Sequence, residues 1–130
     1  VKKNGKLPSN EGISEVVEKC KNKNWLGVIL AGVSPEIIEK TIDEVKQLDI
    51  PFGYKANLWK RDEPLPHTAW ASTPNEIGTN PAEVLGTRED YTDVMFLEFS
   101  KKMMDKGATI LGGCCETKPY HIKKISNLKN

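Results

Sequence analysis

Two adjacent cysteines, Cys114 and Cys115, are the residues with the clearest chemistry in this chain. They follow a short apolar run that stops at two glycines, and Pro119 comes soon after, a pattern typical of a strand, a tight loop and a helix. Two neighbouring thiolates suit a soft metal, zinc first, although a catalytic zinc usually has about three protein ligands. Buried free cysteines are also common as small hydrophobes. The pair alone therefore leaves a metal site and plain packing equally open.

Three other residues deserve comparison with the cysteine pair. His67, flanked by Pro66 and Thr68 in a long irregular segment, has the chemistry of a ligand or base, but a lone loop histidine is usually neither. Cys20 falls on the apolar stripe of a helix expected over residues 11–20, so we interpret it as packing. Glu116 directly follows the pair and is interpreted first as a solvated carboxylate near the start of the next helix.

The elements that must position these residues follow from hydrophobic periodicity. The residues 25–31 form a near-continuous apolar run, typical of a parallel strand covered on both faces. Ser34 and Pro35 predict the start of a helix. A variant capping box at residues 87–90 predicts the start of the longest helix, with Tyr91, Val94, Met95, Phe99 and Met103 on its apolar face. Strands are expected over 25–31, 52–56 and 109–113, and helices over 11–20, 35–48, 87–106 and 119–128.

The alternation of helices and strands predicts an α/β fold with parallel strands and right-handed crossovers. A closed barrel and a small open sheet fit this pattern equally well. Residues 57–88 interrupt it with four prolines, and long ordered loops in compact domains are usually functional. This loop is expected either to overhang the functional face as a lid or donor-binding loop, or to be a surface excursion anchored by its tryptophans.

Composition excludes several classes of function. Nineteen basic and eighteen acidic residues give a net charge of +1, so no long-range field favours nucleic acid or an anionic membrane. No apolar run approaches the ~20 residues of a membrane span. Three cysteines, an odd number, argue against a disulfide framework. We expect a soluble cytoplasmic protein.

The glycine–cysteine run, continued by Pro119, His121 and Ile122, resembles the homocysteine S-methyltransferase family. The resemblance is specific over residues 107–125. Upstream it is weaker but in register. Residues 53–57 look like the family's Tyr-x-Asn strand end, and residues 34–36 look like its x-Pro-Glu helix start. It implies that residues 1–130 form one α/β domain of parallel βα units, corresponding to the last three strands of a (β/α)8 barrel.

The resemblance also implies an enzyme and a mechanism. In this family three cysteines bind zinc, zinc binds the thiol of homocysteine, and the thiolate accepts a methyl group from an activated donor to give methionine. Cys114 and Cys115 correspond to two of the ligands, and the donor is not identified by the sequence. Counting back from Pro35 places Gly32 where the third cysteine is expected. Asn57 and Glu116 are candidate substrate-binding residues.

Glycine has no ligand atom, so the zinc site implied by the resemblance is incomplete unless His67 or Glu116 is recruited. The chain is also much shorter than the ~250 residues of a whole (β/α)8 barrel. We therefore expect an incomplete barrel, and two hypotheses stay open. The chain is either a partial homocysteine S-methyltransferase or a catalytically inactive α/β module. Either one would dock with a missing N-terminal half-barrel or with a second copy of itself, because three strands leave two unpaired edges.

Overall fold

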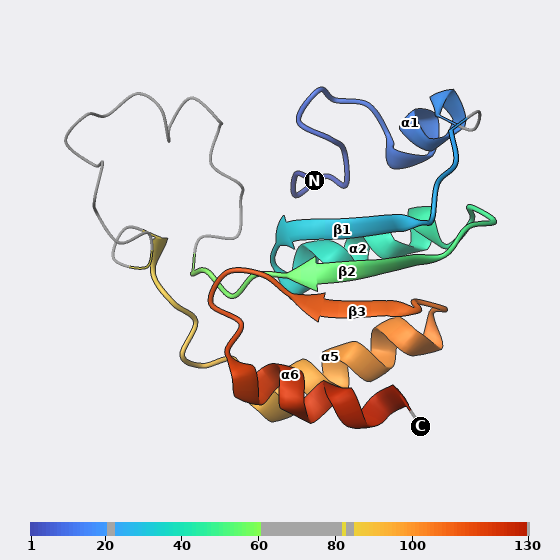
Figure 1. Ribbon diagram of the computed structural model, residues 1–130. Coiled ribbons are helices and arrows are strands. Elements are labelled where there is room, and N and C mark those ends of the chain that lie inside the picture. Colours follow the sequence, from blue (N-terminus) through green and yellow to red (C-terminus); the bar gives the residue numbers. More distant parts are fainter. Residues whose placement is uncertain (21–22, 61–81, 83–84, 130) are drawn as a thin grey trace.

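The computed structural model describes residues 1–20, 23–60, 82 and 85–129. Helices and strands alternate through most of this length (Figure 1). The elements are α1 (Ile13–Lys19), β1 (Val28–Val33), α2 (Pro35–Val45), β2 (Phe52–Ala56), α5 (Asp93–Asp105), β3 (Ile110–Gly113), α6 (Pro119–Ser126) and the 3-10 helix η1 (Asn127–Lys129). The predicted α/β class is confirmed. In the described ranges, no helix has both the length and the apolar character needed to cross a membrane.

The three strands form one parallel sheet in the order β1-β2-β3. Tyr54 in the central strand lies opposite Leu30 on one side and Leu111 on the other. The register shifts between Ala31 and Val33, which is a local irregularity at the end of β1. All three strands run the same way, so their carboxyl ends meet at one edge of the sheet (Figure 1). The cysteine pair follows β3 at this edge.

Local sequence explains α2, which connects β1 to β2. Ser34 is its N-cap, and the Ser34 hydroxyl accepts a hydrogen bond from the backbone N–H of Ile37. Pro35 occupies the first helical position, where its missing N–H costs nothing. Ile38 and Ile42, spaced four apart, are fully buried against the sheet. The predicted start of this helix and the predicted strand 52–56 are both confirmed.

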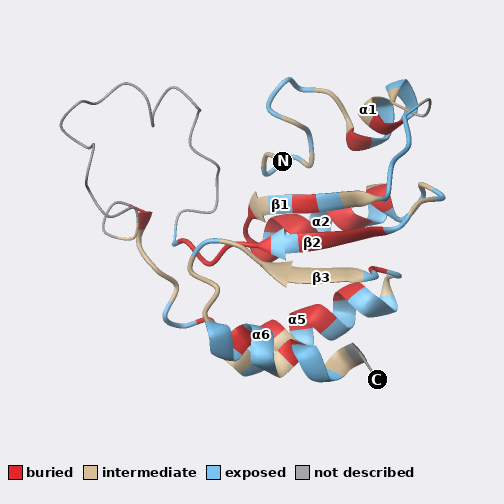
Figure 2. Cartoon of the chain, in the orientation of Figure 1, coloured by how far each residue is buried: buried red, intermediate tan, exposed pale blue. Residues whose placement is uncertain are grey.

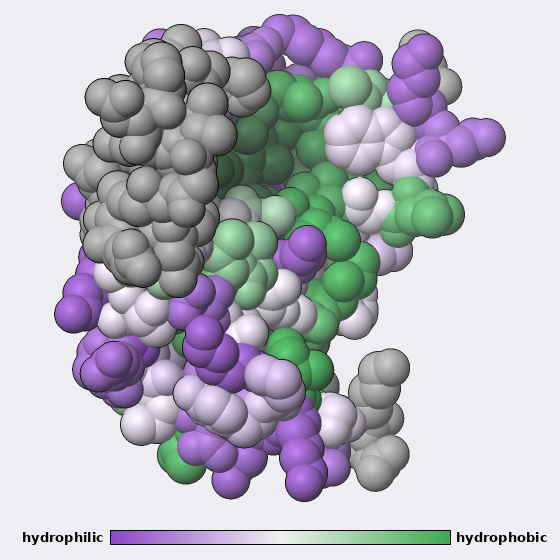
Figure 3. Space-filling model, turned by 60° about the vertical axis from the view of Figure 1, so that its left-hand side comes forward, coloured by the Kyte–Doolittle hydropathy of each residue, from purple (hydrophilic) through white to green (hydrophobic). Residues whose placement is uncertain are grey.

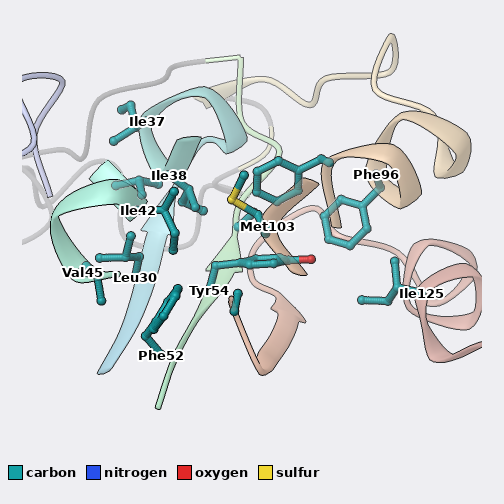
Figure 4. Close-up of a cluster of buried hydrophobic side chains, with 14 of the residues drawn as sticks. Leu30, Ile37, Ile38, Ile42, Val45, Phe52, Tyr54, Phe96, Met103 and Ile125 are labelled. Carbon is teal, nitrogen blue, oxygen red and sulfur yellow. The ribbon is translucent and has the colours of Figure 1, made fainter. Parts of the chain in front are cut away.

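The core lies between one face of the sheet and helices α2 and α5 (Figures 2 and 4). Tyr54 stands in its middle, fully buried, with the rings of Phe96 and Phe99 packed edge-on against it. Its hydroxyl donates a 2.6 Å hydrogen bond to Ser100 Oγ, and Ser100 donates in turn to the carbonyl of Phe96. Burial raises the pKa of Tyr54 to about 12, and the Ser100 hydrogen bond offsets part of that rise. The polar end of this core tyrosine is thus fully satisfied.

The prediction that the first strand is covered on both faces was wrong. The strand begins at Val28 rather than residue 25, and it continues through Val33. Leu30 is buried, but Ile29 is 45% exposed and Ala31 is exposed, so burial alternates along the strand. The physical reason is that α2 and α5 pack on the same face of the sheet. The opposite face, which we call the open face (Ile29, Ala31, Lys55, Ile110 and Gly112), is half-buried or exposed.

The predicted start of the longest helix was also wrong. Helix α5 begins at Asp93, and Thr92 is its N-cap because its hydroxyl accepts from the N–H of Met95. This shift of the start changes the buried face: Phe96 is fully buried, whereas Val94 and Met95 are 53% and 44% exposed. At the other end of the chain, Cys20 is the half-buried C-cap of α1, one residue beyond the helix whose buried stripe it was predicted to join.

Gly53 permits the close approach of β2 and β3, which generates a stability prediction. A Cβ added at Gly53 would overlap the carbonyl oxygen of Ile110, a backbone atom that cannot move without shifting β3. A Cβ added at Gly112, one strand away, meets nothing closer than 3.7 Å. We expect Gly53→Ala to destabilise the fold by about 3 kcal/mol or more, and Gly112→Ala to be tolerated. Urea unfolding of both variants checks this, and equal stabilities would contradict the strand pairing.

Tyr54 generates a prediction at high pH. The unfolded chain releases a tyrosine proton near pH 10, whereas folded Tyr54 holds it to about pH 12. The stability that the buried Tyr54 phenol contributes is therefore fully present below pH ~10 and is lost as the pH rises through about 12. Relative to Tyr54→Phe, the wild type should lose about 2 to 3 kcal/mol across this window, measured by denaturant unfolding at each pH. Tyr120→Phe is the control, because Tyr120 is 57% exposed. Parallel curves for wild type and Tyr54→Phe would contradict the burial of the phenol.

Candidate functional site

The segment leaving the central strand binds the ends of both outer strands. The backbone N–H of Asn57 donates to the carbonyl of Val33 at the end of β1 (2.9 Å). The carbonyl of Ala56 accepts from the N–H of Cys114 (2.8 Å), and the N–H of Leu58 donates to the carbonyl of Cys115 (3.0 Å). The backbone around the cysteine pair is therefore held on both sides by residues 56–58.

The two thiols lie side by side at the carboxyl end of β3. Cys114 is half-buried, Cys115 is exposed, and their sulfur atoms are 3.9 Å apart. Two thiolates at about 2.3 Å from one tetrahedral zinc would be about 3.8 Å apart, so the observed spacing suits two corners of such a site. Burial raises the pKa of the Cys115 thiol, and the neighbouring Cys114 raises it further. Both effects disfavour the thiolate form of Cys115, and a bound cation would favour it.

Gly32 lies at the end of β1, on the same edge of the sheet. Its φ of +73° is the left-handed conformation that glycine adopts without strain, and its carbonyl oxygen accepts from the side chain of Asn57. A Cβ built there would meet no atom of the described residues within 4 Å, so those residues leave room for a side chain. Across the described residues, no group of three or more His, Cys, Asp or Glu side chains is arranged to hold a metal ion. The described residues thus fit two corners of a zinc site and supply no further ligand for it.

Asn57 was predicted as a candidate substrate-binding residue. The structure places it at the strand-end edge, 7% exposed. Its Nδ2 donates to the carbonyl of Gly32 (2.7 Å), and its Oδ1 accepts from the N–H of Trp59 (3.5 Å). Both ends of the amide are therefore engaged by the protein, which gives Asn57 a structural role between the first two strand ends.

Glu116 is held in place rather than solvated. Its φ is +61°, an unusual value for a residue with a side chain, and its side chain is 15% exposed. Glu116 Oε2 accepts hydrogen bonds from Lys118 Nζ (2.8 Å) and Thr87 Oγ1 (2.9 Å). The contact with Lys118 lowers the pKa of Glu116 most, and the contact with Thr87 lowers it further. The carboxylate thereby connects the cysteine loop to the end of the long segment 57–88. Sequence reasoning missed Thr87 and Lys118, and no local pattern indicates the 29-residue contact.

Two further residues explain the motif that follows the cysteines. Thr117 Oγ1 donates to the carbonyl of Ala56 (3.0 Å), and a side chain at Gly113 would collide with Thr117. His121 is buried within α6, where its Nδ1 accepts from the N–H of Lys118 (2.9 Å). Its Nε2 lies 3.1 Å from the carbonyl of Tyr91, to which it donates as the neutral tautomer. The second glycine and the histidine therefore shape the loop and fix the helix behind it.

The remaining candidates are not part of this arrangement. His67 lies outside the described residues. Cys20 caps α1, whose chain leads toward the amino end of β1, and the cysteine pair is at the carboxyl end of the sheet (Figure 1). In a view turned so that the strand-end side of Figure 1 comes forward, hydrophobic surface gathers between more hydrophilic regions (Figure 3).

The role of Asn57 can be tested by substitution. Asn57→Ala removes both side-chain hydrogen bonds and leaves the Gly32 carbonyl without this donor, so we expect a loss of about 1 to 3 kcal/mol in unfolding free energy. Asn4→Ala is the matched control, because the Asn4 side chain is exposed and accepts only from the nearby N–H of Lys6. The control should change stability by less than about 0.5 kcal/mol. Equal effects in thermal or urea unfolding would exclude the bridging role.

Comparison with known proteins identifies the same family as the sequence motif around the cysteine pair. The sequence profile described as Homocysteine S-methyltransferase matches residues 1–128, which is nearly the whole chain. No curated protein and no solved structure matches the chain significantly. The matched region contains all three strands, the Asn57 segment and the cysteine pair. On this evidence the chain belongs to the homocysteine S-methyltransferase family.

Proposed function

We propose that this chain takes part in methyl transfer from an activated donor to the thiol of homocysteine, giving methionine. Membership of the family supports an S-methyltransferase-like function in general. The observation that carries the specific proposal is the pair of thiols 3.9 Å apart at the carboxyl end of β3. In parallel α/β folds, ligand sites lie at the carboxyl ends of the strands.

Cys114 and Cys115 would hold the zinc ion in this proposal. When bound, zinc would supply the positive charge that lowers the pKa of a substrate thiol. The protein's own contribution is positional: Ala56 and Leu58 hold the backbone of both cysteines through hydrogen bonds. Glu116 is not ready to act as a further ligand, because Oε2 of its carboxylate is bound by Lys118 and Thr87. The proposal therefore requires a donor that the described residues do not supply, and His67 remains a candidate.

The open face supports a second element of the proposal, a partner. Ile29 is 45% exposed and Leu26, just before β1, is 93% exposed, although both are large apolar side chains. A missing half-barrel or a second copy of the chain, packed on this face and along the edge of β1, would bury them. The same observations, together with Gly32, favour the alternative that the chain is a catalytically inactive module that docks with a partner chain.

Zinc content and methyl transfer together test the proposal. We expect zinc at close to one per chain after reconstitution under reducing conditions, and its loss in Cys114→Ser. Cys20→Ser is the control, because it removes one thiol at the other end of the sheet. Methionine formation from homocysteine, with methylsulfonium, betaine and methylated-cofactor donors supplied in turn, should follow the zinc content. If zinc is absent and no methionine forms, the proposed activity is wrong for this chain and the inactive module is favoured.

Replacing Gly32 tests whether the missing ligand is what limits the site. Gly32→Cys adds a thiol where a Cβ has open space, at a cost of about 1 to 2 kcal/mol for a side chain at positive φ. Gly32→Ala has the same backbone cost and adds no ligand, so it is the matched control. We expect zinc affinity to rise at least about tenfold in Gly32→Cys and not in Gly32→Ala, measured by competition with a chromophoric chelator. Equal affinities would show that Gly32 lies too far from the pair.

A further inference from the structure

The cysteine pair also has the properties of a site for a ligand that needs only two thiols. All three cysteines of the chain are free, and only Cys114 and Cys115 lie close together. Cys115 is exposed and Cys114 half-buried, so the pair is accessible from solvent. We propose that Cys114 and Cys115 form a binding site for monosubstituted trivalent arsenicals. This inference goes beyond the proposed function and needs neither zinc nor methyl transfer.

Coordination number separates this ligand from zinc. Zinc usually takes four ligands, and the described residues offer no group of three or more metal-binding side chains. A monosubstituted As(III) centre already carries one carbon substituent and is satisfied by two sulfur atoms. The absence of a side chain at Gly32, which leaves zinc short of a ligand, therefore does not matter for the arsenical. Among the described residues, Gly32 leaves space on the same edge of the sheet, since a Cβ there would meet none of their atoms within 4 Å.

The local structure favours closure of both bonds on one arsenic. The backbone of each cysteine is fixed by a hydrogen bond to residues 56–58, so the sulfurs start 3.9 Å apart. An arsenic bridge needs the two sulfurs somewhat closer, which a rotation of the exposed Cys115 side chain about its Cα–Cβ bond would achieve. Once the first As–S bond has formed, the second forms within the same molecule, with the high effective concentration of a tethered group.

The reaction balances without an oxidant or a reductant. An arsenical R–As(OH)2 reacts with the two thiols to give R–As bonded to both sulfurs and two molecules of water. Two As–S bonds replace two As–O bonds, and each thiol proton leaves with one hydroxide. Arsenic stays trivalent throughout. Neither sulfur is oxidised, so the bridge is reversible by a competing dithiol.

Phenylarsine oxide is the probe, and intact-protein mass spectrometry in the presence of a metal chelator is the readout. We expect one phenylarsenic group per chain in the wild type and in Cys20→Ser, retained in excess 2-mercaptoethanol and removed by 2,3-dimercaptopropanol. In Cys115→Ser, and likewise in Cys114→Ser, the adduct should be at least about a hundredfold weaker toward the monothiol. Cys115→Ser is the deciding variant, because Cys115 is exposed and its replacement leaves the core intact.

Two results would overturn the inference: no adduct on the folded wild type, or an adduct on Cys115→Ser that resists the monothiol as well as the wild-type adduct does. Circular dichroism of each variant establishes that it is folded. The result is independent of the zinc and methyl-transfer experiments. An adduct without zinc binding supports the dithiol site and counts against the proposed function, and zinc binding without an adduct does the reverse.

Discussion

The arrangement at the strand ends depends on the hydrogen bonds made by residues 56–58 as they leave the central strand. This segment donates to the end of β1 through Asn57 and exchanges bonds with the cysteine loop through Ala56 and Leu58. Backbone groups make these bonds, so they do not depend on which side chains the neighbouring loops carry. The middle strand is in turn fixed by the Tyr54 side chain in the core. Core packing on one face of the sheet therefore determines the positions of the two thiols at its edge.

Much of this could be predicted from the sequence where local rules apply. Ser34 followed by Pro35 locates the start of α2, because capping and a missing N–H are properties of adjacent residues. The strand 52–56 was predicted with its observed bounds, and the cysteine loop was placed between β3 and α6. Each of these patterns is complete within a few residues, and the tertiary structure has no reason to override it.

The errors arose where contacts between residues far apart in the sequence determine the local structure. Thr87 has the sequence of a helix cap, but its hydroxyl donates to Glu116, 29 residues later, and Thr92 caps α5 instead. Because α5 begins five residues later than predicted, a different face of the helix is buried. Phe96, which the predicted apolar face did not include, is fully buried. The apolar run at 25–31 indicates a strand that is buried by other elements, but it does not indicate which elements pack on which face. In the structure, helices cover only one face of this strand. Asn57 shows that contacts between distant residues can add a role that the sequence does not reveal, since its side chain binds the carbonyl of Gly32, 25 residues earlier. Its predicted role in substrate binding stays a prediction.

The left-handed backbone at Gly32 has a consequence for how this chain can change over time. Glycine adopts a φ of +73° without strain, whereas any other residue at this position would lower the stability of the fold through backbone strain. A variant with any other residue at this position therefore begins at a disadvantage in stability, whatever its side chain then adds. Substitution toward glycine relieves backbone strain here and substitution away from glycine creates it, so the two directions of change are unequal. The favoured glycine therefore leaves Cys114 and Cys115 without a side-chain ligand from this strand end.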